Sequence, residues 1–288
     1  MRQLLFLVLS GLLLSPVWAA VSVTDDAGMP VVLEKPAQRI VSLAPYLTEL
    51  LFAAGAGDAL VGVTEFSDYP VAARSLPRVG GGGGLDIEAI MALQPDLVVA
   101  WQSGNPSAQV EKLQSFGIPV FISEPRQLGD VPATLRRLGR LAGTGAVASV
   151  QEAHFNKRHG ELRNRYASRP KVSLFYQIWE QPLMTLNGEH IFADVVRLCG
   201  GENIFHALPA LAPQVDIEAV LQADPQVIVV AADTDDPSSL SQWQRWPQLS
   251  AVKQGQVYAI QREQLVRHTP RILDGAARLC ELLDAARP

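Results

Sequence analysis

One pattern of apolar and polar positions occurs twice in the chain, at a constant offset of 130 residues. Residues 85–100 read LDIEAIMALQPDLVVA, and residues 215–230 read VDIEAVLQADPQVIVV. Six of the sixteen aligned positions are identical, and most of the others exchange one apolar residue for another. A match of this length without a gap indicates that the chain contains a duplicated structural unit.

Each copy has the pattern of a short helix followed by a buried strand. Asp86 is a favourable helix N-cap, and Glu88 falls in the first turn, where the helix dipole favours a negative charge. The apolar residues that follow recur on one helical face, and Pro95 ends the helix. Residues 97–100 then form an apolar run suited to a strand buried on both faces of a parallel sheet. Two such units predict two similar α/β lobes.

Short apolar runs alternate with helical patterns along the rest of the chain. The apolar runs predict strands at residues 39–43, 60–64, 119–122, 172–176 and 257–260. The helical patterns predict helices at residues 48–54, 108–115, 131–141, 191–199 and 270–286. The predicted fold class is therefore α/β, with two lobes built on parallel sheets.

A charged stretch, residues 146–169, contains one glycine and no proline, and it predicts a single long helix. A helix of this length would span roughly 36 Å at the usual rise per residue. We interpret it as a rigid connector between an N-terminal lobe at residues 20–145 and a C-terminal lobe at residues 170–288. The alternative is an ordinary surface helix that belongs to one of the lobes.

Composition and the first residues bear on where the protein works. The chain has 288 residues and a net charge of −5, which makes nucleic acid an unsuitable partner. Arg2, an apolar run at residues 4–14 and Ala19 have the pattern of a secretory signal at residues 1–19. That run is too short to span a membrane, and no cysteine follows it to carry a lipid anchor. We expect a soluble, periplasmic protein.

The chain contains two cysteines, Cys199 and Cys280. In an oxidising compartment a disulfide between them is the favoured interpretation. The alternative is a pair of buried free thiols. Two cysteines are too few for a typical cysteine metal site.

The glycine run at residues 80–84 precedes a predicted helix, as a phosphate-binding loop would. The basic and hydroxyl residues of a P-loop do not follow it, and Asp86 and Glu88 place negative charge where phosphate would lie. A loop or a close approach of two backbone segments is the better interpretation.

Aromatic and polar residues follow the predicted strands. Because ligands of open parallel sheets bind beyond the carboxyl ends of the strands, these residues are candidate ligand contacts. Aromatic walls with a few polar groups suit a large, flat, partly apolar ligand, although each aromatic taken alone could simply pack in the core. The candidates are Tyr46, Phe66, Trp101, Tyr176, Trp179, Glu263 and Arg267. Trp243 and Trp246, three residues apart, are interpreted as packing residues.

Catalysis has little support in the sequence. There is no nucleophile elbow, no HExxH motif and no cysteine–histidine pairing. All five histidines follow residue 150, and no tight carboxylate cluster accompanies them. We therefore expect no catalytic residues, no metal site and no cofactor.

Four stretches resemble the periplasmic cobalamin-binding proteins of bacterial ABC importers. They are RIVSLAPYLTELLFAAGAGDALVGVTEFSDYP, LDIEAIMALQPDLVVAWQSGN, LCGGENIF and RHTPRI. The resemblance covers nearly all of the chain beyond the signal. It implies two Rossmann-like lobes joined by one long helix, a corrinoid in the cleft between them, and little closure of the lobes.

The resemblance also implies roles for individual residues. Family ligand contacts match at Trp101 and Arg267 and, by residue type, at Phe66, Tyr176 and Glu263, while Tyr46 stands at a cleft position. Gly82 and Ala212 depart from the family, because cleft tryptophans of its best-known member align near them. These departures bear on which ligand is bound more than on the class of protein.

Glu88 and Glu218, the glutamates of the two repeats, match the family's docking residues. The resemblance implies that each pairs with arginines of a membrane permease subunit, so that a monomeric carrier docks on a permease dimer. The alternative is that both glutamates only stabilise the starts of their helices.

Three other functions were considered. The same type of carrier could transport haem or a ferric siderophore, with Tyr46 or His268 coordinating haem iron and Arg267 pairing with a ligand carboxylate. A secreted two-lobed enzyme would need a catalytic set that the sequence does not contain. A structural or adhesive protein would not need the mirrored glutamates.

Overall fold

The structure is a computed structural model of the chain, and it describes residues 20–81, 83–232 and 238–287. The secretory signal predicted at residues 1–19 lies outside the described residues, as does Gly82. Within the described part, no helix combines the length and apolar character that crossing a membrane requires.

The N-terminal lobe is built on a four-stranded parallel sheet with the order β4-β3-β7-β8. Its strands are β3 (Ile40–Ser42), β4 (Leu60–Val63), β7 (Leu97–Trp101) and β8 (Val120–Ser123). Its helices are α1 (Pro45–Ala53), α2 (Ile87–Ala92), α3 (Ser107–Ser115) and α4 (Asp130–Leu141). Helix α1 begins three residues before the predicted start at residue 48, because proline is well suited to the first turn of a helix.

The C-terminal lobe has a second four-stranded parallel sheet, with the order β10-β9-β11-β12. Its strands are β9 (Val172–Gln177), β10 (Gly201–Asn203), β11 (Val227–Ala232) and β12 (Val257–Gln261). Its helices are α6 (Ile191–Leu198), α7 (Ile217–Ala223), α8 (Ser238–Ser241), α9 (Ser250–Lys253), α10 (Arg262–Val266) and α11 (Ile272–Ala285). The sequence pattern had not predicted the edge strand β10 or the short helix α10.

The two sheets have the same topology. In each, the first strand along the chain lies between the second and the third, and the fourth lies beyond the third. The sequence repeat corresponds to the same unit in both lobes, α2 with β7 and α7 with β11. The expectation of two α/β lobes with parallel-sheet cores is confirmed.

Both faces of each sheet are buried, which explains the continuous apolar runs of the strands. In β7, Leu97 and Val99 pack into the large core that also lies under α1 and α4, while Val98 and Ala100 pack into a second cluster with Ile90 of α2. The same alternation occurs in β9 and β11.

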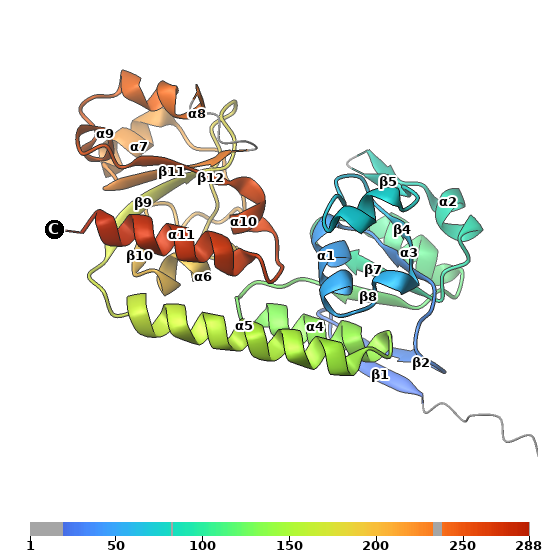
Figure 1. Cartoon of the computed structure of the whole chain (residues 1–288). Helices are drawn as coiled ribbons and strands as arrows, with labels where there is room; N and C mark the ends of the chain where they lie inside the picture. Colours follow the sequence, from blue (N-terminus) through green and yellow to red (C-terminus); the bar gives the residue numbers. More distant parts are fainter. Residues whose placement is uncertain (1–19, 82, 233–237, 288) are drawn as a thin grey trace, which may run out of the picture.

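The long helix α5 (Gly145–Tyr166) runs along both lobes (Figure 1). It packs against α4 of the N-terminal lobe and against α11 and α6 of the C-terminal lobe. It ends three residues before the predicted end at residue 169, and Pro170 follows before β9 begins. The helix therefore provides a continuous support beneath the two sheets.

Two small hairpins complete the N-terminal lobe. A hairpin near the start of the chain is formed by β1 (Val21–Thr24) and β2 (Pro30–Leu33). The glycine run forms a second hairpin, in which β5 (Gly80–Gly81) pairs with β6 (Gly84–Leu85). A side chain at Gly80 would collide with the backbone of Gly84, so the run allows two backbone segments to approach closely.

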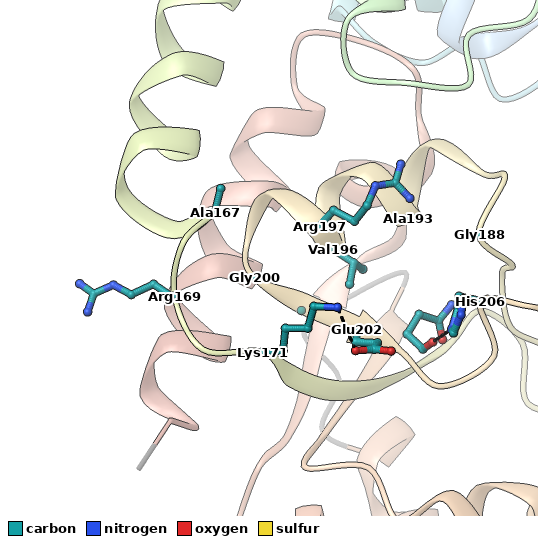
Figure 2. Close-up of a pocket in the computed structure, with 12 residues that line it drawn as sticks. Ala167, Arg169, Lys171, Gly188, Ala193, Val196, Arg197, Gly200, Glu202 and His206 are labelled. Carbon is teal, nitrogen blue, oxygen red and sulfur yellow. Dashed lines mark hydrogen bonds and ion pairs between the residues drawn. The ribbon is translucent and has the colours of Figure 1, made fainter.

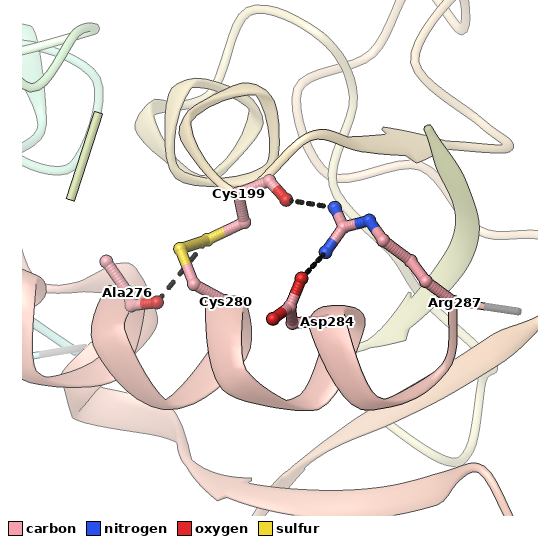
Figure 3. The surroundings of a disulfide bond; sticks show 5 residues. All are labelled: Cys199, Ala276, Cys280, Asp284 and Arg287. Carbon is pink, nitrogen blue, oxygen red and sulfur yellow. Dashed lines mark hydrogen bonds and ion pairs between the residues drawn. A yellow bond between two sulfur atoms is a disulfide. The ribbon is translucent and has the colours of Figure 1, made fainter. Parts of the chain in front are cut away.

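The predicted disulfide between Cys199 and Cys280 is present (Figure 3). It joins the end of α6 to α11 over a sequence separation of 81 residues. Both cysteines are fully buried, and Arg287 donates a hydrogen bond to the carbonyl oxygen of Cys199 over 2.7 Å. The bridge therefore ties the last helix of the chain to the core of the C-terminal lobe.

Candidate functional site

The candidate site lies at the carboxyl ends of the strands in the two sheets. In each sheet the connections after the first and the third strand run to opposite sides, and ligands of open parallel sheets bind at such a point. In the N-terminal lobe these are β3 and β7, and they are followed by Tyr46 and Trp101. Asn105 holds the two strand ends together. Its side chain accepts a hydrogen bond from the backbone N–H of Trp101 over 2.7 Å and donates one to the carbonyl oxygen of Leu43 over 2.8 Å.

Four rings from the two lobes meet at this edge. Tyr46 and Trp101 of the N-terminal lobe lie edge to face, with ring centroids 5.7 Å apart. His268 of the C-terminal lobe lies 5.0 Å from Tyr46 and 6.1 Å from Trp101, and the ring of His190 lies 5.5 Å from that of His268. Rings from both lobes therefore pack against one another at this edge.

Burial shifts the proton equilibria of these rings. It lowers the pKa of His268 to about 4, and it lowers that of His190 to about 3, with the positive charges of His268 and Arg126 adding to the effect. Burial also raises the pKa of Tyr46 well above its usual value, although the hydrogen bond to Ser123 opposes this. All three rings are therefore neutral at pH 7.

The equivalent edge of the C-terminal lobe carries an open pocket of about 470 Å³. Trp179 is 53% exposed at its rim, and the guanidinium of Arg262 lies 5.4 Å from the centre of the indole ring. Arg262 also donates a hydrogen bond to the carbonyl oxygen of Ile178 over 2.6 Å, which fixes its position. Gln177, which follows Tyr176 in β9, supplies an amide to the pocket. The pocket combines an aromatic surface with groups that can bind amides or carboxylates.

A buried ion cluster joins the lobes beside this edge. Arg267 of the C-terminal lobe donates hydrogen bonds to Glu49 over 2.6 Å, to Glu263 over 2.5 Å and to Asp68 over 3.3 Å. Arg271 donates two more to Glu49, over 2.7 and 3.0 Å. Although burial alone lowers the pKa of Arg271, its hydrogen bonds to Glu49 outweigh this and raise it.

The loop after β4 contributes to the same cluster. Phe66 has φ = 62°, a left-handed conformation that is costly for a residue other than glycine and is found most often at functional sites. Its ring is 74% exposed, and its carbonyl oxygen accepts a hydrogen bond from Arg267 over 3.3 Å. This geometry places an uncovered aromatic ring directly beside the ion cluster.

The structure places the predicted ligand contacts at different depths. Phe66 and Trp179 are exposed, and Trp101, Glu263 and Arg267 are partly buried. Tyr46 and Tyr176 are buried, and Tyr176 stacks on Phe192 with a centroid distance of 4.1 Å. These two tyrosines therefore lie beneath the surface of the edge, and their role as ligand contacts stays a prediction.

Several buried polar atoms at the strand ends have no hydrogen-bond partner among the described residues. They include Nε1 of Trp101, the hydroxyl of Tyr176 and Nδ1 of His268. Unpartnered buried polar groups are rare in folded proteins and require an explanation. A polar ligand or water that reaches this edge would supply the missing partners.

The sequence analysis missed several residues of the site, among them Glu49 and Arg271. Glu49 is the one charged residue in α1, and a carboxylate on an otherwise apolar helix requires a partner once it is buried. That signal could have identified Glu49, although not the arginines to which it binds.

The repeated glutamates lie at the starts of α2 and α7. Both Glu88 and Glu218 are exposed. Asp86 caps its helix as predicted, by accepting a hydrogen bond from the backbone N–H of Ala89 over 2.9 Å. Asp216 makes no such bond, so the two copies agree in the placement of the glutamate but not in capping.

Another hollow, of about 570 Å³, lies beside β10 and the end of α5 (Figure 2). Lys171 and Glu202 on its wall form an exposed ion pair over 3.3 Å. Its lining residues precede β9, lie on or before α6, or lie along and just after β10, and none of them lines the 470 Å³ pocket beyond β9. It is therefore separate from the candidate site. No group of three or more metal-ligating side chains occurs in the described part of the chain.

The profile of a family described as "Periplasmic binding protein" matches residues 40–263. The chain belongs to this family. It is 39% identical over 253 residues to the vitamin B12-binding protein of Vibrio cholerae, with 88% of this chain and 91% of that protein covered. It is also 39% identical to the vitamin B12-binding protein of Yersinia pestis, with 85% and 86% covered.

Solved structures agree with this assignment. The crystal structure of the periplasmic vitamin B12-binding protein of Vibrio cholerae superposes with a TM-score of 0.82, covering 87% of this chain and 98% of that one. A haem-binding protein from Roseiflexus, 22% identical with a TM-score of 0.75, shares the fold. The relatives are binding proteins and not enzymes, as expected from the sequence.

Proposed function

We propose that this periplasmic binding protein captures cobalamin or a related corrinoid between its lobes and delivers it to an ABC importer. The observation that carries the proposal is the aromatic surface at the strand ends of both lobes, with Trp101 at the end of β7 and Trp179 with its pocket beyond β9. The 39% identity to vitamin B12-binding proteins supports the choice of ligand. We place the lobes at residues 20–145 and 170–288, with the connector at residues 146–169.

The chemistry of the edge suits a corrinoid. A corrin ring is broad and largely apolar, and it carries amide side chains around its rim. Phe66 and Trp179 offer exposed aromatic surface, while Glu263 offers a carboxylate that can bind amides. Tyr46 and His268, the candidate ligands for haem iron, are both buried, and the Tyr46 hydroxyl already donates to the carbonyl oxygen of Ser123 over 3.2 Å. These features favour a corrinoid over haem.

The remaining proposals concern the localisation of the protein and its partners. We infer that the signal at residues 1–19 is removed on export and that the protein acts as a monomer. Glu88 and Glu218, exposed at equivalent positions of the two lobes, would each pair with a basic site on one subunit of the permease dimer.

A ligand-retention experiment tests the proposal. Purified protein is incubated in parallel with hydroxocobalamin, haemin and a ferric siderophore, desalted, and measured by visible absorption spectroscopy. We expect stoichiometric retention of the corrinoid alone. Retention of haem or siderophore without corrinoid would reassign the ligand, and loss of all three would overturn the carrier function.

A further inference from the structure

A shallow groove lies beside the docking helix of the N-terminal lobe, between α2 and the end of α3. Two apolar side chains are exposed along it, Met91 with 38% and Phe116 with 51% of its surface accessible. Glu88 lies on the α2 side of the groove and Lys112 on the α3 side. Single exposed apolar residues are ordinary, but two that line one hollow between opposite charges form a patch of the kind that binds a partner.

The C-terminal lobe differs at the corresponding position. In the sequence repeat, Leu221 of α7 occupies the place of Met91. Leu221 is partly buried, and it packs against a cluster that contains Trp243 and Trp246. The lobe thus covers this part of its docking helix with its own side chains. Met91 and Phe116 belong to none of the apolar clusters formed by the described residues.

We propose that the groove receives an apolar side chain of the permease subunit that docks on Glu88. This inference rests on the proposed function. The occupant would present an apolar residue between a basic group that faces Glu88 and an acidic or carbonyl group that faces Lys112, which matches the charges on the two sides of the groove. The N-terminal lobe is then held by charge and apolar contact, and the C-terminal lobe by charge.

The two ends of the carrier therefore have different tasks in docking. Exposed charges mainly speed the encounter of two proteins, whereas a desolvated apolar anchor mainly slows their dissociation. The N-terminal lobe sets how long the carrier stays on the importer. Release after delivery would begin at the C-terminal lobe, which has the weaker contact.

The test combines Met91→Ser with Phe116→Ser and compares the double variant with Val150→Ser, a change of a 66% exposed residue on α5. Surface plasmon resonance measures binding to the permease–ATPase complex of the same organism in lipid nanodiscs. We expect the double variant to dissociate about tenfold faster with a nearly unchanged association rate. Val150→Ser should behave as the wild type does.

Dissociation at the wild-type rate, in a double variant that still retains corrinoid and melts at the wild-type temperature, would overturn the inference and leave the proposed function intact. A wild-type protein that binds corrinoid but forms no complex would overturn docking and the groove together. If the serine variants melt early, a photo-crosslinking amino acid at position 116 replaces them. It should link to the permease, whereas the same group at position 150 should not, and equal labelling would refute the proposal.

Discussion

Arg267 of the C-terminal lobe donates a hydrogen bond to Glu49 of the N-terminal lobe over 2.6 Å, and only 11% and 2% of the two side chains are accessible. Arg271 adds a two-pronged contact to the same carboxylate. Two guanidinium groups and one buried carboxylate therefore join the lobes beside the candidate site. Moving the lobes apart would expose this cluster to water and break its geometry, so the cluster favours the observed spacing.

Replacing Glu49 tests this relationship. Glu49→Gln removes the buried carboxylate that Arg267 and Arg271 share, and Arg267 then keeps only more exposed carboxylates as partners. Removing one partner of a buried ion pair typically costs about 3–5 kcal/mol. We expect a loss of unfolding free energy in that range, measured by urea denaturation, together with weaker corrinoid binding because the lobes are no longer held at one spacing. Small-angle scattering should show a larger radius of gyration.

An exposed ion pair provides the control. Arg158 of α5 and Asp274 of α11 lie 2.7 Å apart, with 34% and 49% of their side chains accessible. Exposed pairs contribute less than about 1 kcal/mol. Asp274→Asn should therefore change the unfolding free energy little and leave corrinoid affinity unaltered. Equal effects of the two variants would contradict a special role for Glu49.

The sequence predicted this fold well because its main signals are local. The helix–strand repeat, the apolar runs and the long charged helix each depend on residues close together in the chain. The ion cluster could not be predicted in the same way, since Glu49 and Arg267 are 218 positions apart. The position of a residue near the end of a strand also does not show how deeply its side chain is buried. Tyr176 shares the inner face of β9 with Leu174, and it packs on Phe192 rather than at the surface.

Trp179 is the most direct test of the ligand surface. Because its side chain is 53% exposed, Trp179→Ala should change the unfolding free energy little. Losing an aromatic anchor typically weakens binding by about 1–3 kcal/mol, and isothermal titration with hydroxocobalamin measures this. Trp243→Ala is the contrasting variant, because Trp243 is 1% exposed and donates to Gln177 over 2.8 Å. It should mainly destabilise the fold. Unchanged affinity in Trp179→Ala would assign Trp179 to another role.

The two buried histidines predict a pH dependence of stability. Burial lowers the pKa of His268 to about 4 and that of His190 to about 3, while an unfolded chain titrates near 6.5. Between these values the unfolded state binds more protons, so the unfolding free energy falls as the pH drops from 7 toward 4, by up to about 1.4 kcal/mol per pH unit for each histidine.

Urea denaturation at pH 7, 6 and 5 measures this slope. His268→Gln should reduce the slope of the unfolding free energy against pH by up to the contribution of one histidine, because glutamine does not titrate. His154→Gln, a change of an exposed histidine on α5, serves as the control and should keep the wild-type slope. A wild-type unfolding free energy that stays constant from pH 7 to pH 5 would show that neither buried ring is neutral in the way the structure implies.

The disulfide gives a further prediction. Cys199 and Cys280 close a loop of 81 residues, for which chain entropy predicts a stabilisation of about 4 kcal/mol. Replacing both cysteines with serine should lower the unfolding free energy by up to this amount. Thiol labelling of the denatured wild type should detect no free thiol until reductant is added. Two reactive thiols without reductant would contradict the bridge.

The paired glutamates give the sharpest test of docking. Glu88→Arg combined with Glu218→Arg should leave corrinoid binding in solution unchanged, because both side chains are exposed and neither lines the pocket beyond β9. Transporter-dependent uptake of cobalamin should be abolished, since each reversal places a positive charge against a basic site. Single reversals should have intermediate effects.

The salt dependence of docking separates the possible roles of these glutamates. Contacts between exposed carboxylates and arginines weaken as the ionic strength rises, so complex formation with the permease should slow in high salt for the wild type and much less for the double reversal. Normal uptake by the double reversal would mean that the glutamates only stabilise the starts of their helices. The repeat would then reflect duplication alone. Reduced corrinoid affinity would instead place them in the ligand cleft and contradict the docking role.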